Sequence, residues 1–172
     1  MSRIEDKLAE LGLELPEHVA PAGSYLVAYR AGDLVFTSAV GPRTNESNIT
    51  GVMGKDCTLE DGYEAARRTC LRMLTNVKSV VGDLDKVKHV VKVFGMVQAT
   101  AEFNQYALVV NGCSDLLVEL FGENGKHARS SMGVTRNPFD GVVSIDAVFE
   151  TSNDSAAISP VSEPSEFLID AM

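Results

Sequence analysis

Tryptophan is absent from the 172 residues, cysteine occurs only three times, and no two cysteines have the CxxC spacing. An odd, scattered set of cysteines argues against a disulfide framework and against a structural zinc site. No apolar run approaches the ~20 residues of a membrane-spanning helix, and the first residues include acids where a signal peptide has an apolar stretch. We therefore expect a cytoplasmic protein with reduced thiols that does not enter a membrane.

Basic residues and histidines are also scarce. The chain has 15 Lys and Arg against 24 Asp and Glu, which gives a net charge of −9. Such a chain has little non-specific attraction for nucleic acid or for anionic lipid, so we expect neither as a partner. The three histidines, His18, His89 and His127, form no HxH or HxxxH pattern. We therefore expect no metal site.

The chain does have the composition of one folded domain, with 45% hydrophobic and 23% charged residues. Residues 1–20 predict a short helix and a connector that contains proline, and residues 21–150 form the main domain. Residues 151–172 are rich in serine, proline, alanine and acids, so we expect a disordered acidic tail there.

The first residues have the features of a helix start. Ser2 and Glu5 have the spacing of a capping box. Ile4, Leu8 and Leu11 fall on one helical face. These residues predict a short amino-terminal helix with one apolar stripe.

The main domain predicts an α+β fold with its elements in the order ββαβαββ. The predicted elements are strands at Tyr25–Tyr29 and Leu34–Ser38, a loop at Gly41–Gly54, a helix from the Thr58–Asp61 capping box to Gly82, a strand at Val87–Val97, a helix at Asn111–Phe121, and a strand pair at Ser130–Arg136 and Val142–Glu150. A sheet with both long helices on one face leaves its other face bare. We therefore expect an oligomer that buries this face.

Arg129 has the strongest local case for binding a ligand. It lies where the segment Gly125–Ser131 passes from a glycine-containing loop into a strand, so its planar fork can receive a carboxylate. His127 lies two residues earlier and shares that face of an extended chain. On local grounds both residues also fit ordinary roles, an ion-paired surface arginine and a partly exposed loop histidine.

Patterns for nucleophilic catalysis and for phosphate binding are missing. There is no GxSxG motif. Cys113, at the start of a predicted helix, is either a thiol of lowered pKa or, as we favour, a small core residue. Gly51–Lys55 departs from the spacing of a phosphate-binding loop and does not follow a strand.

Five segments in consistent order, between about Pro21 and Glu150, form a recognisable set: Gly23–Tyr25, Gly32–Ser38, Gly82–Leu84, Val109–Leu117 and His127–Ser130. Together they resemble the RidA/YjgF family, which older usage calls the L-PSP endoribonucleases. The blocks NGCSDLL and HARS are similar to a branch of that family with a longer amino terminus.

This resemblance implies a chorismate-mutase-like fold. It also implies a homotrimer whose sheets pack into a central barrel, with three pockets between subunits. The activity it implies is hydrolysis of reactive enamines or imines to a 2-keto acid and ammonia, without a cofactor or a metal. A trimer of this kind would cover the bare face of the predicted sheet.

The resemblance also assigns residues. By motif position, Arg129 corresponds to the arginine that pairs with the substrate carboxylate, Tyr25 to a pocket tyrosine and Asn111 to an asparagine near the site. Ser144 stands where well-characterised deaminases of the family have a glutamate that positions the attacking water. Serine can hydrogen-bond a water but carries no charge near neutral pH. Asp146 shares the strand face of Ser144 and can act through a shifted water.

Three hypotheses follow. The first is a trimeric imine/enamine deaminase, a hydrolase in which Arg129 holds the substrate carboxylate and Ser144 or Asp146 holds the water. The second is a non-catalytic trimer that binds small carboxylic acids, and the missing glutamate motivates it. The third and weakest is an endoribonuclease, because a net charge of −9 opposes binding to RNA.

Overall fold

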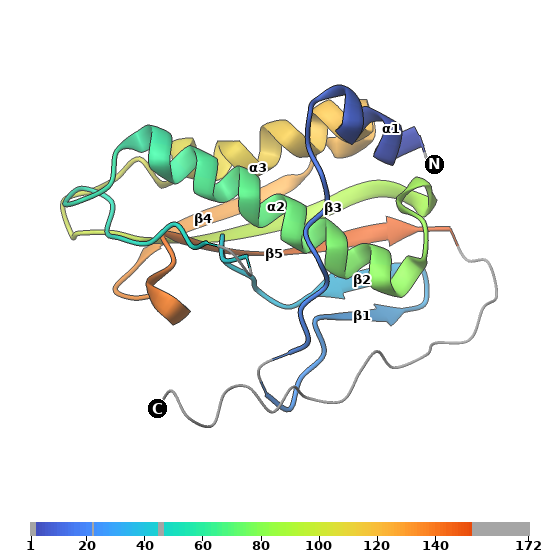
Figure 1. Cartoon of the computed structure of the whole chain (residues 1–172), viewed down its shortest axis with the longest axis horizontal. Helices are drawn as coiled ribbons and strands as arrows, with labels where there is room; N and C mark the ends of the chain where they lie inside the picture. The colour runs from blue at the N-terminus through green and yellow to red at the C-terminus, as the bar shows by residue number, and fades with distance from the viewer. Residues whose placement is uncertain (1–2, 22, 45–46, 153–172) are drawn as a thin grey trace.

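The computed structural model describes residues 3–21, 23–44 and 47–152, and it has one five-stranded sheet with helices on one face (Figure 1). The elements are α1 Arg3–Glu10, β1 Ala28–Ala31, β2 Leu34–Thr37, α2 Leu59–Val81, β3 Val87–Gln98, α3 Tyr106–Phe121, β4 Ala128–Val134 and β5 Val143–Thr151, with short 3-10 helices η1 Leu84–Lys86, η2 Gly122–Gly125 and η3 Pro138–Asp140. The predicted ββαβαββ order, the α+β class and the leading helix are confirmed. No helix in the described ranges is long and apolar enough to span a membrane.

Helix α2 begins and ends where the sequence predicts. The Thr58 side chain accepts a hydrogen bond from the Asp61 amide at 3.1 Å, and the Asp61 carboxylate accepts one from the Thr58 amide at 2.8 Å. The Thr58 hydroxyl also donates to the Asp61 carboxylate at 2.7 Å, and this bond together with the one from the Thr58 amide lowers the pKa of Asp61. Gly82 ends the helix with a φ of 81°, a value that side chains disfavour. The capping box therefore fixes the residue at which the longest helix begins.

The amino-terminal helix α1 is tied down by a residue far along the chain. Both oxygens of Asp85, in η1, accept hydrogen bonds from the first amides of α1, from Arg3 at 2.8 Å and from Ile4 at 3.0 Å. Ile4 and Leu8 are buried, as predicted, whereas Leu11 lies beyond the helix and is exposed. Ser2 of the predicted capping box lies outside the described residues.

Two element starts differ from the prediction by three residues or more. Helix α3 begins at Tyr106, five residues before Asn111, and its β-branched Val109 and Val110 are buried in the core. The sequence did not predict this first turn, because valine has a low helix propensity and no side chain caps the helix start. Strand β1 begins at Ala28, so Tyr25 lies in the bend before it. Cys113 is therefore inside a helix rather than at its start, and it is fully buried, as the core interpretation predicted.

The predicted pairing of the last two strands is wrong. The strand order across the sheet is β1-β2-β5-β3-β4, so β3 lies between β4 and β5. Strand β4 runs parallel to β3 after the α3 crossover, and β5 runs antiparallel to β3 on its other side. The short connection between β4 and β5 favoured a hairpin, but η3 carries the chain past β3 instead. Strand β4, which carries Arg129, is consequently an edge strand.

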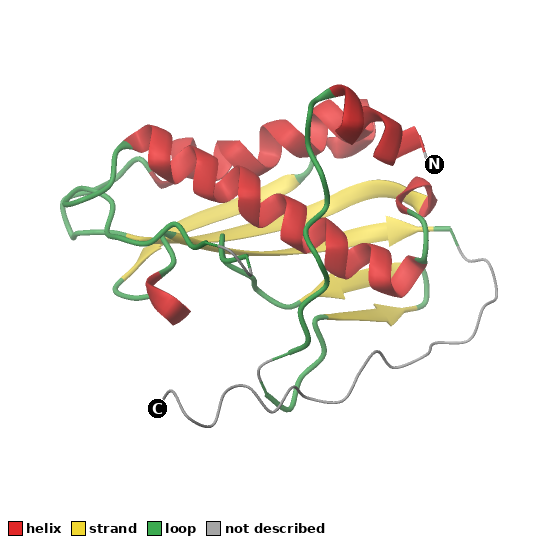
Figure 2. Ribbon diagram, in the orientation of Figure 1, coloured by secondary structure: helices red, strands yellow, loops and turns green. Residues whose placement is uncertain are grey.

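Side chains alternate between the two faces of the sheet. Along β5 the core side is formed by Val143, Ile145, Ala147 and Phe149, all buried. The side chains between them face away from the helices, toward a surface that no element in the described part of the chain covers (Figure 2). This surface includes exposed apolar side chains, namely Tyr29, Leu34, Phe36 and Met132.

Candidate functional site

Arg129 lies on the helix-covered side of β4. Its backbone is in register with Val93 of β3, whose side chain is buried in the core, and neighbours in parallel strands share a face. The guanidinium points at α3. Its Nη1 donates hydrogen bonds to Asn111 Oδ1 at 2.8 Å and to Ser114 Oγ at 2.9 Å. Helix α3 therefore holds the half-buried arginine in one orientation.

The rest of this guanidinium is unused. The two hydrogens of Nη1 serve Asn111 and Ser114, while Nε and Nη2 have no hydrogen-bond or ion-pair partner among the residues that the structure describes. The edge formed by Nε and Nη2 is the planar fork that binds a carboxylate through two parallel hydrogen bonds. The geometry thus presents an oriented positive charge that no described carboxylate neutralises.

His127 joins the same network through Ser114. Its Nδ1 lies 2.6 Å from the Gly125 carbonyl oxygen, which can only accept a hydrogen bond, so Nδ1 carries the hydrogen. The other ring nitrogen, Nε2, lies 2.9 Å from Ser114 Oγ. Burial lowers the pKa of His127, and the positive charge of Arg129 and the nearby His89 lower it further, against the Gly125 hydrogen bond that raises it. The imidazole is therefore neutral near neutral pH.

A close contact between helices α2 and α3 positions Asn111 and Ser114. Gly112 faces α2 so closely that a Cβ atom there would lie 2.0 Å from the Tyr63 carbonyl oxygen. The Tyr63 hydroxyl also donates a hydrogen bond to Asp115 at 2.9 Å. Only glycine permits this approach, and it fixes the place of α3 over β4.

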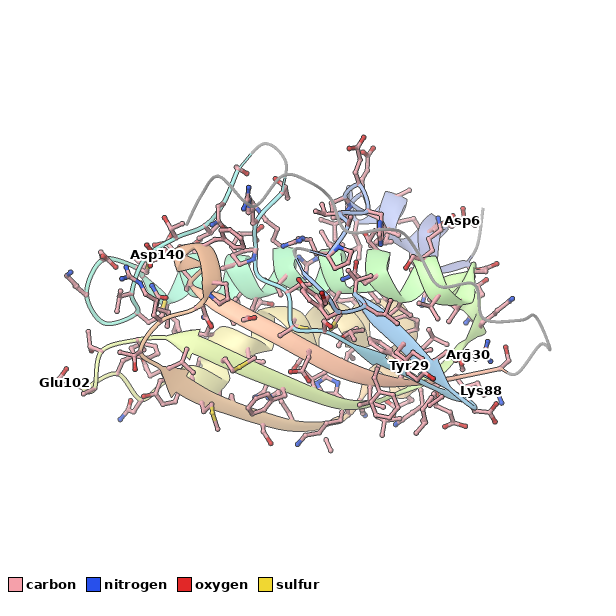
Figure 3. The ribbon with its side chains drawn as sticks, turned by 90° about the horizontal axis from the view of Figure 1, so that it is seen from below. Asp6, Tyr29, Arg30, Lys88, Glu102 and Asp140 are labelled. Atoms are coloured by element: carbon pink, nitrogen blue, oxygen red, sulfur yellow. The ribbon has the colours of Figure 1, made fainter. Side chains whose placement is uncertain are left out.

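Ser144 and Asp146 lie on the opposite face of the sheet from Arg129. They occupy alternate positions of β5, next to Met96 and Phe94 of β3, on the face without helices. Figure 3 looks onto this face with the helices behind it. Burial raises the pKa of Asp146, which has no hydrogen-bond partner within the described ranges. One chain therefore does not bring these two residues to Arg129.

Tyr25 is also remote from Arg129 in the single chain. It precedes β1, at one edge of the sheet, whereas Arg129 is on β4 at the other edge, and Tyr25 is half exposed. Of the six residues that the sequence singled out, the chain itself assembles Arg129, Asn111 and His127. The roles assigned to all six residues stay predictions.

The sequence analysis missed Ser114, the residue that links Arg129 to His127. It is three residues after Asn111, a spacing that places both side chains on one face of a helix. Both positions lie inside the predicted helix Asn111–Phe121, but a serine on a helix has no local feature that marks it as a site residue. The serine of the NGCSDLL block was visible, and the helical spacing could have found it.

The cysteines and the acidic residues form no reactive or metal-binding cluster. Burial and a hydrogen bond with Cys113 raise the pKa of Cys70 well above its usual value, so the Cys70 thiol stays protonated in the core. Within the part of the chain that the structure describes, no three His, Cys, Asp or Glu side chains are grouped to hold a metal ion.

The fold and the site define a class of protein: an α+β chain of chorismate-mutase-like fold whose oriented arginine lies between an edge strand and helix α3. A family model described as "YjgF/chorismate_mutase-like, putative endoribonuclease" matches residues 5–151. The chain belongs to this YjgF/RidA family, and the resemblance noted in the sequence is confirmed.

Relatives from several organisms match most of this chain. Protein TCP17 of Trypanosoma cruzi is 36% identical over 153 residues, which cover 88% of this chain and 96% of the relative. The crystal structure of Atu1372 from Agrobacterium tumefaciens, of unknown function, has a TM-score of 0.82 at 34% identity and covers 87% of this chain and 93% of that one. A Shewanella oneidensis structure, described as a "putative endoribonuclease", has a TM-score of 0.82 at 29% identity and covers 86% and 98%.

Proposed function

We propose that the protein is a RidA-like deaminase that hydrolyses reactive 2-imino and 2-enamino acids to 2-keto acids and ammonia. One observation carries this proposal. Arg129 is held through Nη1 by Asn111 and Ser114, and its Nε and Nη2 edge has no described partner. A short 2-imino acid has a carboxylate next to its reacting carbon. The fork can therefore bind the substrate and fix the position of the C=N bond.

The chemistry asks little of the protein. The carbon of a protonated imine is already electrophilic, so the site has to orient the substrate and activate one water molecule. The water oxygen bonds to that carbon while the C=N π electrons move to nitrogen. The resulting carbinolamine loses ammonia and leaves the 2-keto acid. An enamine enters the same route after protonation at its carbon.

We further propose a homotrimer with its sites between subunits. In one chain Tyr25, Ser144 and Asp146 are separated from Arg129 by the sheet, and a shared pocket would need residues from two chains. The exposed apolar side chains on the helix-free face favour burial against another copy. Arg129 on an edge strand is well placed for such a boundary.

The direct test measures ammonia release from imines that an amino-acid oxidase generates in the same solution. The wild-type protein should accelerate release. Arg129→Ala should reduce kcat/KM by about a hundredfold or more, because two charge-assisted hydrogen bonds are lost. Arg136→Ala is the matched control: Arg136 is exposed and, among the residues that the structure describes, forms an ion pair with Asp140 alone, so the rate should not change. A wild-type protein without activity, or a fully active Arg129→Ala, would refute the proposal.

Ser144 favours a second candidate, a trimer that binds small carboxylic acids without catalysis. Its side chain stands where the family's deaminases have glutamate and carries no charge to activate a water. In that case 2-keto acids would raise the melting temperature through Arg129, while imines would decay at the uncatalysed rate. Incubation of the same preparation with RNA tests the endoribonuclease description of the family, which the net charge of −9 disfavours.

A further inference from the structure

A chain of three hydrogen bonds runs from Arg129 through Ser114 and His127 to the backbone carbonyl of Gly125. Arg129 Nη1 donates to Ser114 Oγ at 2.9 Å, Ser114 Oγ lies 2.9 Å from His127 Nε2, and His127 Nδ1 lies 2.6 Å from the Gly125 oxygen. The carbonyl accepts only, and the guanidinium donates only. For a neutral imidazole, the Arg129 donor and the Gly125 acceptor therefore determine where the hydrogens of Ser114 and His127 lie.

The single hydroxyl hydrogen of Ser114 has one place to go. With the hydrogen of the neutral imidazole on Nδ1, the lone pair of His127 Nε2 faces Ser114 and can accept a hydrogen bond. The Ser114 oxygen already accepts from Arg129, so its own hydrogen points at Nε2. The arrangement is a hydroxyl aimed at a base beside a cation that stabilises negative charge on oxygen.

We propose that Ser114 and His127 are the proton-accepting pair of the Arg129 site, and this inference rests on the proposed function. As the water oxygen bonds to the C=N carbon, a water proton moves to Ser114 Oγ and the hydroxyl proton of Ser114 moves to His127 Nε2. The imidazolium returns its proton through Ser114 to the amine nitrogen of the carbinolamine. The C–N bond then breaks and ammonia leaves with its bonding pair. As the C=O bond forms, the carbinolamine hydroxyl gives its proton through Ser114 to His127, and the imidazolium releases that proton to solvent.

The surroundings of His127 suit a proton acceptor. Arg129 from β4 and His89 from β3 are the charged or titratable groups that act on it, Ser114 is its contact from α3, and the Gly125 carbonyl is its contact from η2. Burial and the Arg129 charge lower the pKa of His127, so the imidazole is unprotonated near neutral pH. A carboxylate bound to Arg129 would offset the positive charge and strengthen the base when substrate is present.

The kinetic test uses His127→Asn, because asparagine keeps an N–H donor for the Gly125 carbonyl. We expect kcat to fall by about a hundredfold, the usual contribution of a general base. The acid limb of the kcat/KM profile should disappear, while affinity for pyruvate, an unreactive carboxylate, should change by less than about threefold, because Arg129 is intact. His18→Asn, at an exposed position in the connector, is the matched control and should match the wild type.

A second measurement does not depend on activity. Nitrogen-15 NMR of the histidine rings should show His127 with its hydrogen on Nδ1, and pyruvate should raise the pKa of His127 in the wild type but not in Arg129→Ala. A hydrogen on Nε2, or an active His127→Asn that keeps its acid limb, would overturn the paired role and leave the deaminase proposal standing. A wild-type protein that releases no ammonia would overturn both.

Discussion

A guanidinium has five hydrogens to place, and the described protein groups use only the two on Nη1 of Arg129. The partners that take them, Asn111 and Ser114, are neutral, so they orient the cation without cancelling its charge. This distinguishes Arg129 from Arg67, which forms an ion pair with Glu119 at 2.9 Å. The neutral partners leave the positive charge of Arg129 available to the external carboxylate that we propose as its ligand.

Asp146 gives a prediction about pH at the residue scale. Burial raises its pKa, so the folded chain holds the proton more tightly than the unfolded chain. The free-energy cost of burying the ionised Asp146 carboxylate is absent in acid, where the group is protonated in both states. It destabilises the fold as the pH rises through the folded-state pKa. Asp146→Asn should therefore raise the melting temperature at about pH 7, and this gain should vanish by about pH 4, near the usual carboxyl pKa.

The control for Asp146→Asn is Glu102→Gln, an exposed carboxylate at a turn, labelled in Figure 3. Its melting temperature should follow the wild type at both pH values. A lower melting temperature of Asp146→Asn at neutral pH would mean that a favourable partner stabilises the ionised Asp146 carboxylate. Burial would then be the wrong cause for its raised pKa.

Residue types alone pointed to Arg129, His127 and Asn111, because an arginine at a loop-to-strand junction and two family motifs are visible in the letters. They did not single out Ser114, because its role depends on its hydrogen bonds in space to Arg129 and His127. Nor could they separate Tyr25 from Arg129. The pairing of Tyr25 with Arg129 comes from the family resemblance, and the pocket between two subunits that we propose would bring these residues together.

At the scale of elements, the contact between α2 and α3 supports the site. A Cβ atom at Gly112 would collide with the backbone of Tyr63, which cannot move without displacing α2. Gly112→Ala should lower the free energy of unfolding by about 2–3 kcal/mol, typical of forced overpacking. It should also weaken pyruvate binding, because Asn111 and Ser114 would shift away from Arg129.

Chemical denaturation and calorimetric titration measure these two effects. Gly23→Ala is the control, since a Cβ there meets only the Tyr25 ring at 3.7 Å, an ordinary contact. Its stability should stay within about 0.5 kcal/mol of the wild type. Equal stability of Gly112→Ala and wild type would show that the helices can separate freely, contrary to the packing described above.

A helix or strand could be predicted wherever a local feature marks its ends, as the capping box and Gly82 do for α2. Pairing was not predictable from local features. The connection between β4 and β5 has the length of a hairpin. The α3 crossover nevertheless places β4 parallel to β3 on one side, and β5 pairs with the other side of β3. Partner choice in a sheet depends on all its strands together.

At the scale of the whole molecule, the bare sheet face predicts self-association. Phe36 lies on that face with 43% of its surface exposed. Phe36→Glu would place a charge in the proposed contact between subunits, so light scattering should find a monomer where the wild type is a trimer. If sites lie between subunits, this variant should also lose ammonia release.

Leu11→Glu is a matched control for association, because Leu11 is also 43% exposed but follows α1 on the helical side. It should remain trimeric and active. A monomeric wild type, or a trimeric Phe36→Glu, would remove the shared pocket from the proposal, and the family's quaternary arrangement would not extend to this chain.

The alternation along β5 constrains how this protein can vary in evolution. Four of its residues seal the interior, and those between them form the opposite surface. Inserting or deleting one residue would move every side chain that follows the change to the other face, carrying carboxyls inward and Phe149 onto the helix-free face. Homologues should therefore tolerate exchanges of side chains at Ser144 and Asp146 far more readily than any change in the length of this strand.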